Sequence, residues 1–225
     1  MAKNKKVIYT IILGAYDNLK EPDLVCPDFD YICFTDRKDL VSKTWTIHLI
    51  KCKPKINLKR CASRFITYPF KYLKEYEISM LIGGQISIHC DIGNFVDKVL
   101  PGGKSLAIMI HPKRDCIYQE AEVVLECKKD KPEIVTKQME KYRNNKYPEH
   151  AGLVSSGIIV RRHSDKKMVK HCKLWYREVL NFSQRDQLSF NYILWKYRLI
   201  EPSYFYPEVR KSDFIVRPHN FIQQF

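Results

Sequence analysis

Seven short apolar runs, rich in β-branched and aromatic residues, recur along the chain. They cover residues 6–13, 30–35, 44–50, 78–82, 85–88, 105–110 and 153–161. Most of them are apolar at nearly every position, whereas a strand with one wet face alternates apolar and polar residues. The runs therefore predict strands that are buried on both faces of a sheet.

Helical patterns lie between these runs. Residues 58–68 stop before Pro69, and residues 132–143 begin with a proline, which suits the first turn of a helix. Two further stretches repeat apolar residues at helical spacing: Met168, Cys172, Trp175 and Val179, then Leu188, Tyr192 and Trp195. The alternation predicts one α/β domain over residues 1–225, with a Rossmann-like, mostly parallel central sheet flanked by helices. Ligands of such folds bind at the carboxyl ends of the strands.

Charge and composition narrow the choice of function. The 225 residues carry a net charge of +14, which favours phosphate-bearing partners such as a nucleotide, a nucleic acid or an anionic membrane. No apolar run is long enough to span a membrane, and the basic, apolar start lacks a small-residue cleavage site. The 8 cysteines form no C-x-x-C pair. We therefore expect free, buried thiols in the reducing cytoplasm.

A basic stretch without any acidic residue runs from residue 40 to residue 74. Arg60 and Arg64 lie four residues apart on the predicted helix, so they share one face and repel each other. A diphosphate between the two guanidinium groups would reverse that repulsion. A solvated basic face and a nucleic-acid surface are the alternatives, and charge alone does not separate them.

Two short motifs have both a structural and a functional interpretation. Gly83 and Gly84 join two apolar runs, which indicates a strand–turn–strand unit whose backbone can approach a ligand. Ser183 and Asp186 are spaced as a capping box for the next helix. A carboxylate and an amide at that helix start, Asp186 and Gln187, can alternatively grip sugar hydroxyls.

Histidines give weaker signals. Neighbouring strand residues point to opposite faces, so His89, Cys90 and Asp91 are not expected to converge on a metal. His111 ends a predicted strand, where sites collect, whereas His219 near the C-terminus is uninformative alone.

Taken in order, several motifs resemble nucleotide-sugar glycosyltransferases with the GT-A fold. The segments are 9–22 (YTIILGAYDNLKEP), 34–36 (FTD), the Arg60-x-x-x-Arg64 pair, 111–120 (HPKRDCIYQE), 161–163 (RRH) and 183–190 (SQRDQLSF). The set is most similar to small enzymes of large algal DNA viruses and to uncharacterised bacterial and plant proteins. The Asp-Gln step also resembles that of the retaining family 8 transferases. The resemblance spans nearly the whole chain and implies a nucleotide-sugar-binding half (1–90) and an acceptor-side half (91–225).

The resemblance implies a donor site for a nucleoside diphosphate sugar, with a UDP-sugar as the expected donor. Thr10, Ile12 and Tyr16 would line the nucleoside pocket, and Asp36 would hydrogen-bond the uracil. Arg60 and Arg64 would meet the diphosphate, and His219 would approach it from the C-terminal tail.

The same resemblance divides the remaining residues between the transferred sugar and the acceptor. Asp186 and Gln187 would hold the sugar, with Asp186 near the anomeric carbon. His111 and Arg114 would face the acceptor, a glycan or a glycoprotein. Retention of configuration is the expected stereochemistry, and the aromatic content leaves material for a homodimer interface.

One position departs from the family pattern. The fourth strand of the family ends in an Asp-x-Asp or single Asp that binds Mn²⁺ or Mg²⁺. Here Gly83, Gly84 and Gln85 occupy that place, and none is ionic. The sequence therefore predicts no metal ligands there, and cations would have to neutralise the diphosphate. A transferase without a metal is the leading hypothesis, followed by a transferase that binds Mn²⁺ or Mg²⁺ weakly through other groups. A non-catalytic nucleotide or glycan binder and, last, a basic nucleic-acid-binding domain are the rivals.

Overall fold

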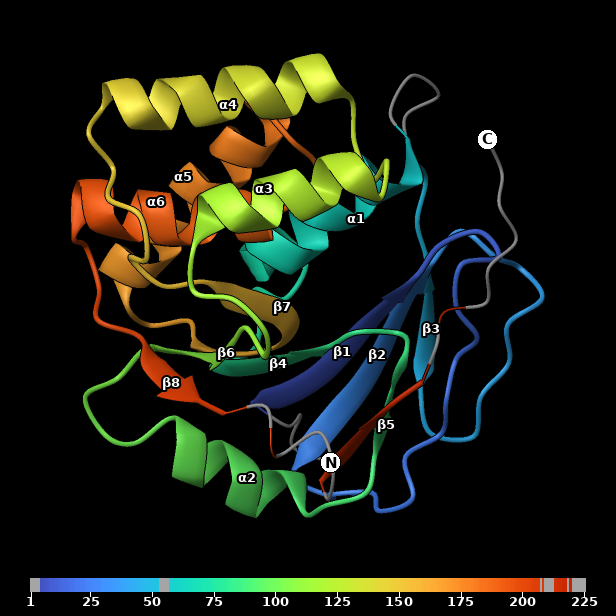
Figure 1. The fold of residues 1–225 in the computed structure, drawn as a ribbon. Helices are drawn as coiled ribbons and strands as arrows, with labels where there is room; N and C mark the ends of the chain where they lie inside the picture. Colours follow the sequence, from blue (N-terminus) through green and yellow to red (C-terminus); the bar gives the residue numbers. More distant parts are fainter. Residues whose placement is uncertain (1–4, 53–56, 207, 209–212, 218, 220–225) are drawn as a thin grey trace.

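The computed structural model describes residues 5–52, 57–206, 208, 213–217 and 219; Lys53 and Lys55 of the acid-free stretch lie outside them. Its main sheet has the strand order β3-β2-β1-β4-β7-β6-β8 (Figure 1). The strands are β1 (Lys6–Ile12), β2 (Phe29–Thr35), β3 (Thr46–Leu49), β4 (Ile78–Ile82), β6 (Leu106–Ile110), β7 (Val154–Arg162) and β8 (Ser203–Phe205).

Strand direction places several carboxyl ends at one edge. β1 runs parallel to β2 and β4, β2 to β3, and β6 to β8, whereas β7 is antiparallel to both β4 and β6. Strands β1, β2, β4 and β6 therefore end at the same edge of the sheet. The last residues of β1 and β2, Ile12 and Thr35, are register partners.

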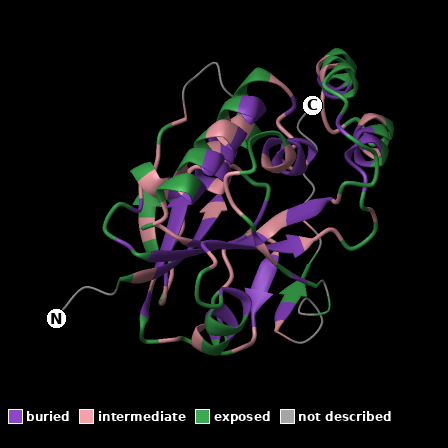
Figure 2. Ribbon diagram, turned by 90° about the vertical axis from the view of Figure 1, so that its left-hand side faces the viewer, coloured by how far each residue is buried: buried purple, intermediate pink, exposed green. Residues whose placement is uncertain are grey.

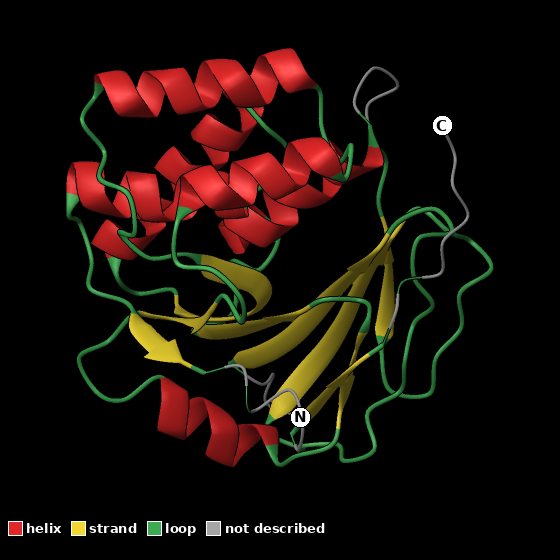
Figure 3. Cartoon of the chain, viewed as in Figure 1, coloured by secondary structure: helices red, strands yellow, loops and turns green. Residues whose placement is uncertain are grey.

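Helices cover both faces of this sheet. Helices α1 (Leu58–Thr67), α3 (Ile117–Glu126), α4 (Pro132–Asn144), α5 (Lys166–Asn181) and α6 (Gln187–Tyr197) lie on one face, and α2 (Ile92–Val99) lies on the other (Figures 1 and 3). A short 3-10 helix, η1 (Pro69–Lys71), follows α1. A two-stranded sheet of β5 (Ile86–Ile88) and β9 (Phe214–Val216) lies on the α2 side. Buried residues are concentrated in the strands between these layers (Figure 2).

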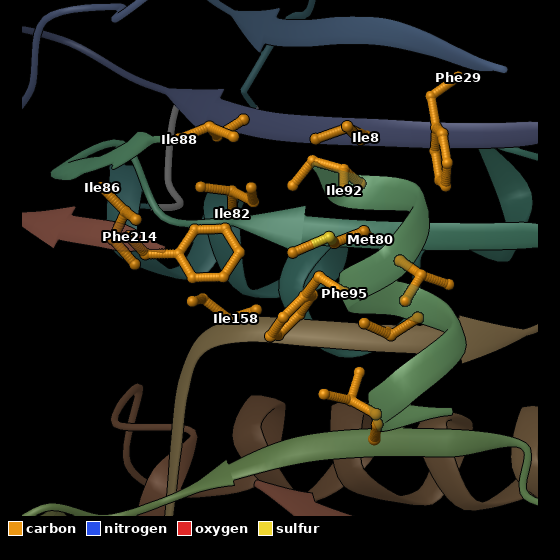
Figure 4. Packing of buried hydrophobic residues seen from close by; sticks show 14 of the residues in the cluster. Ile8, Phe29, Met80, Ile82, Ile86, Ile88, Ile92, Phe95, Ile158 and Phe214 are labelled. Carbon is orange, nitrogen blue, oxygen red and sulfur yellow. The ribbon is translucent and has the colours of Figure 1, made fainter. Parts of the chain in front are cut away.

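Alternation along β1 supplies both layers of the core. Ile8 belongs to the cluster on the α2 side of the sheet, which also contains Phe95 of α2 and Phe214 of β9 (Figure 4). Val7 and Tyr9 belong to the opposite cluster, together with side chains of α1 and α5. Both faces are apolar because both are covered, as the near-continuous apolar runs predict.

The predicted fold class is confirmed. Every one of the seven predicted strands and four predicted helices corresponds to an observed element, with ends within a few residues. The structure adds α2, α3, β8 and β9, which the sequence analysis does not predict. Strands β8 and β9 have only 3 residues each, which is too short for a periodic signal.

One local expectation is confirmed and another is wrong. Gly83 and Gly84 lie in a turn between two strands, as predicted: β4 ends at Ile82, β5 begins at Ile86, and Ile86 donates its N–H to the Gly83 carbonyl over 2.9 Å. β5 then pairs with β9 outside the main sheet. The cysteines are not all free, because Cys52 and Cys61 form a disulfide that links the segment before α1 to α1 itself. The other six are free thiols. Among the described residues, no helix has both the length and the apolar character that crossing a membrane requires.

Candidate functional site

The carboxyl ends of β1 and β2 are joined by a side chain. Gly14 donates its backbone N–H to Oδ1 of Asp36 over 2.8 Å. Gly14 has a φ of +57°, and a Cβ there would lie 2.9 Å from Leu58 at the start of α1. A glycine is therefore required where the chain leaves β1. Asp36 fixes this exit path, along which Tyr16 follows.

The turn after β4 (hereafter the β4 turn, residues 83–85) lies against the segment that follows β1. Gly83 donates its N–H to the carbonyl of Gly157 in β7 over 2.8 Å. A Cβ on Gly84 would lie 2.6 Å from Cδ1 of Ile12 and 2.9 Å from Oδ2 of Asp17. The backbone of the turn thus packs directly on Asp17, which leaves no room for a side chain at Gly84.

Asp17 and His219 meet beside this turn, although 202 residues separate them. The Asp17 carboxylate is only 6% exposed, and its Oδ1 lies 2.9 Å from Nδ1 of His219. The imidazole in turn packs on the ring of Tyr16, with centroids 4.3 Å apart. Because Tyr16 is 43% exposed, its ring presents a half-open aromatic surface at this edge.

Four cationic side chains surround Tyr16 and Asp17: Lys20, Lys59, Arg185 and Arg217 (hereafter the Tyr16 cation cluster). Lys59 Nζ lies 6.0 Å from the Tyr16 ring centroid, and the field of Arg185 opposes the burial that raises the Tyr16 pKa. Burial and then Arg185 lower the pKa of Lys59.

Lys20 is likewise affected by burial and by a neighbouring cation. Burial lowers the pKa of Lys20, and the charge of Arg217 lowers it further, while Asp17 raises it. Like charges thus repel one another at both ends of the cluster.

Helix α6 starts at the same edge with Asp186 as its N-cap, whose Oδ1 accepts the N–H of Gln187 over 2.9 Å. The side chain is 8% exposed, and Oδ2 is buried without a hydrogen bond among the described residues. Burial raises the pKa of Asp186, while Arg185, Ser156 and the Gln187 amide oppose the shift. Gln187 donates Nε2–H to the Val154 carbonyl over 3.3 Å.

The predicted capping box is wrong. Its proposed first member, Ser183, does not cap α6; its hydroxyl donates to Oδ2 of Asp130 over 2.6 Å and accepts the N–H of Arg185. Asp186 takes the N-cap place itself. Ser183 and Asp186 therefore have the spacing of a capping box but not its hydrogen bonds.

A bulge in β7 connects Asp186 to the β4 turn. The register with β6 slips between Ile108 and Met109, where the partner changes from Ile159 to Ser155. The extra residues include Ser156, which faces Asp186, and Gly157, whose carbonyl accepts from Gly83. Bulges of this kind re-aim side chains near sites.

The predicted acceptor-side residues form a separate buried network at the end of β6. Arg114 contacts Oε2 of Glu120 through Nε (2.7 Å) and Nη2 (2.6 Å), and Glu120 is 3% exposed. His111 Nδ1 accepts the N–H of Arg114 over 3.1 Å, and its Nε2 lies 3.8 Å from Oε2 of Glu120. His111 also donates its backbone N–H to Leu153, next to the residue that Gln187 contacts.

Two residues assigned to the nucleoside pocket lie within the sheet. Thr10 and Ile12 are 3% and 1% exposed, and Ile12 belongs to the core under the sheet. Tyr16 and Asp36 are more accessible and lie nearer to the strand ends. The structure thus separates these four residues into a core pair and an edge pair.

The two arginines of α1 are engaged by the protein itself. Arg60 donates through Nη1 to the carbonyl of Val179 (2.6 Å) and through Nη2 to that of Phe182 (2.6 Å), which closes the end of α5. Arg64 lies over the rings of Phe65 and Tyr72, at 4.7 and 5.5 Å. The structure does not bring either guanidinium together with Asp17 and His219 in any described contact.

Sequence reasoning assigns no role to Asp17, Lys20, Lys59, Arg185, Ser156 or Arg217, although three of them lie within the segments 9–22 and 183–190 that carry the resemblance. Position along the chain gave a signal for two of the six. Asp17 follows a strand end closely, and Gly157 inside an apolar run is typical of a bulge beside Ser156. The lysines and arginines are indistinguishable from the many others in a basic chain.

The residues at the β4 turn do not fit a divalent ion. The described residues contain no group of three or more His, Cys, Asp or Glu side chains that would hold a metal. Asp17 is the carboxylate that lies against the turn, and it already pairs with His219 next to the ammonium of Lys20. A hard cation needs several oxygen ligands, not a neighbouring positive charge.

Comparison with known proteins gives one positive result. The family model described as TOD1/MUCI70, glycosyltransferase-like domain, matches residues 43–219, which is most of the chain and includes the β4 turn, Asp186 and His219. A search of curated proteins finds no match.

Proposed function

The chain belongs to the TOD1/MUCI70 glycosyltransferase-like family, and we propose that it transfers a sugar from a UDP-sugar to a glycan or glycoprotein acceptor. One observation carries the proposal. Segments far apart in sequence bring Tyr16, Asp36, the β4 turn and Asp186 to the edge where the strands end, and a cation cluster lies among them.

The edge where the strands end has groups that suit the base and the phosphates of a nucleoside diphosphate. The half-open Tyr16 ring supports stacking of a flat base, and the Asp36 carboxylate can accept from the imide N–H of uracil. The Tyr16 cation cluster supplies positive charge for the diphosphate. Thr10 and Ile12 support this pocket from beneath, because they are buried behind it.

The surroundings of Asp186 support a role at the transferred sugar. It lies at the positive end of α6 and faces Ser156 of the β7 bulge, whose next residue, Gly157, contacts the β4 turn. During transfer the bond from the anomeric carbon to the diphosphate breaks, and its electron pair goes to the diphosphate oxygen. An ionised Asp186 would stabilise the positive charge on the anomeric carbon. The acceptor hydroxyl then bonds to that carbon on the face that the diphosphate leaves, and it gives its proton to the departing diphosphate. The configuration at the anomeric carbon is therefore retained.

The acceptor would enter from the His111 side. The backbone at residues 153 and 154 contacts both His111 and Gln187, so the two sites are adjacent. The Arg114–Glu120 ion pair fixes the segment after β6 and leaves the imidazole positioned beside it.

A non-catalytic nucleotide or glycan binder is the second candidate. The observation that favours it is the β4 turn itself, where the carboxylate of metal-dependent transferases is missing. Binding without turnover would distinguish this candidate from the first.

Calorimetric titration with UDP, UDP-glucose and GDP-mannose, first in EDTA and then with Mn²⁺, tests the proposal. We expect UDP and UDP-glucose to bind in EDTA, GDP-mannose to bind more weakly, and UDP to be released slowly from UDP-glucose. Failure of every nucleotide to bind in either condition would rule out a donor site.

Asp186→Asn should lower the rate of UDP release about 100-fold or more while the affinity for UDP changes less than threefold. Because burial raises the Asp186 pKa, wild-type turnover should also fall with decreasing pH at a higher pH than an ordinary carboxylate would produce. Asp97→Asn, an exposed position on α2 across the sheet, serves as the control. An unchanged rate in Asp186→Asn would remove this residue from the reaction.

A further inference from the structure

The β4 turn has a cation where the fold's metal-dependent relatives are expected to have a carboxylate. Lys20, in the segment after β1, donates from Nζ to the carbonyl of Gly84 over 2.7 Å and lies 3.5 Å from the carbonyl of Asn18. The turn therefore carries a positive charge and no carboxylate of its own.

The backbone around Lys20 is held firmly. Trp45 donates its indole N–H to the Lys20 carbonyl over 2.9 Å. The next residue, Glu21, accepts from the Ser42 hydroxyl (2.6 Å) and from the backbone N–H groups of Lys43 and Thr44. These contacts tie the segment to the loop before β3, so Lys20 is positioned before any ligand arrives.

Lys20 lies between charges of both signs. Burial lowers its pKa, Asp17 is the counter-charge that raises it, and Arg217 opposes Asp17 by a smaller effect. Asp17 also pairs with His219, so one carboxylate serves several basic groups. Bringing an anion with two or more negative charges to this place would remove the repulsion.

We propose that Lys20 is the cation that binds the donor diphosphate at the β4 turn, in the position where a metal ion would act, with the Asp17–His219 pair holding the opposite wall. The proposal rests on the UDP-sugar site proposed above. As the bond between the anomeric carbon and the diphosphate oxygen breaks, the electron pair goes to that oxygen, and the ammonium stabilises the new charge by a hydrogen bond.

Lys20→Met keeps most of the apolar stem and removes the charge. We expect it to weaken UDP binding in EDTA at least tenfold, while uridine, which has no phosphate, binds within twofold of wild type. Lys20→Arg should retain most of the UDP affinity. Lys104→Met, a lysine paired with Glu201 at the opposite edge of the sheet, should change neither ligand.

The binding results distinguish a failure of the role of Lys20 from a failure of the donor site. A Lys20→Met chain that binds UDP within twofold of wild type, or that loses uridine as strongly as UDP, would overturn the role of Lys20 while leaving the donor site intact. Wild-type binding of UDP only with Mn²⁺ would overturn it as well. A wild-type chain that binds no uridine nucleotide would instead overturn the proposed function, and this proposal with it.

A gain of function sharpens the test. A Cβ at Gly83 would meet only the flexible end of Gln85, at 2.9 Å from Oε1, and Gly83 does not have a positive φ, so a side chain fits there. Gly83→Asp in the Lys20→Met background should therefore create UDP binding that increases at least fivefold with Mn²⁺. No response to Mn²⁺ in a folded double variant would contradict the placement of the diphosphate at this turn.

Discussion

Helix α1 and the Tyr16 cation cluster, which share Lys59, both carry positive charge near the edge where the strands end, yet their other basic groups have different surroundings. The α1 arginines are engaged by the protein: Arg60 closes α5 through backbone carbonyls, and Arg64 lies over aromatic rings. Lys20 and Lys59 lie near other cations, and each also has a carboxylate nearby, Asp17 for Lys20 and Asp130 for Lys59. Positive charge is therefore more available to a ligand where fewer of the donors are already used, as at Lys20, which has one short hydrogen bond, to Gly84.

The largest expected effect comes from replacing Arg60. We expect Arg60→Ala to lower the free energy of unfolding by about 3 kcal/mol, because the carbonyls of Val179 and Phe182 lose a charged donor. UDP affinity should stay within twofold. Urea denaturation and calorimetry measure the two quantities, with Arg177→Ala, an exposed position on α5, as the control. A large loss of UDP affinity in a stable Arg60→Ala chain would return Arg60 to the donor site.

A different arginine, Arg161 in β7, predicts an effect of pH on stability. Arg161 is fully buried, donates to the Tyr9 hydroxyl and lies near His171, whose pKa is lowered to about 4 by burial and then by Arg161. The unfolded chain binds this proton below pH 6.5 and the folded chain only near pH 4, so stability falls as pH decreases between these values.

The His171 contribution amounts to about 2 kcal/mol lost between pH 7 and pH 5. Denaturant titrations at the two pH values measure it, and His171→Phe should reduce the difference. His150→Ala, an exposed control, should not. An equal pH dependence in wild type and His171→Phe would show that the imidazole is not kept neutral by the core.

The smallest expected effects concern the other members of the cluster. Arg185→Ala should weaken UDP binding about tenfold and Lys59→Ala about threefold, each with less than 1 kcal/mol change in stability, because neither closes a helix. Both losses should shrink as salt is raised. Calorimetry at two ionic strengths checks this, and losses that salt does not change would argue against a contact with phosphate.

Much of the fold could be predicted from local pattern. Continuous apolar runs identified the buried strands, and Pro69 and Pro132 marked helix ends, because burial and backbone geometry act over a few residues. The 3-residue strands β8 and β9 were not predictable in this way, since only their partners β6 and β5 make them strands.

The candidate site was only partly predictable. Asp186 stood out because it starts a helix, and Asp36 because of the family resemblance; the structure has both near the strand ends. Ser183 and Asp186 had the right spacing for a capping box, yet Asp130 competes for the Ser183 hydroxyl. Spacing along the chain cannot show such a competitor, because it comes from 53 residues away.

The sequence by itself determined the layered α/β architecture. It also determined that glycines occupy the close-packed β4 turn and that residues 83–85 include no carboxylate. Tertiary structure alone decided which charges remain available to a ligand. Arg60 and Lys20 are equally cationic as residues, but Arg60 closes α5 through short bonds to two carbonyls, whereas Lys20 makes one short bond, to Gly84, and lies near both Asp17 and Arg217. The energy of a charge depends on the groups that folding brings within a few ångströms of it, and those groups come from distant parts of the chain.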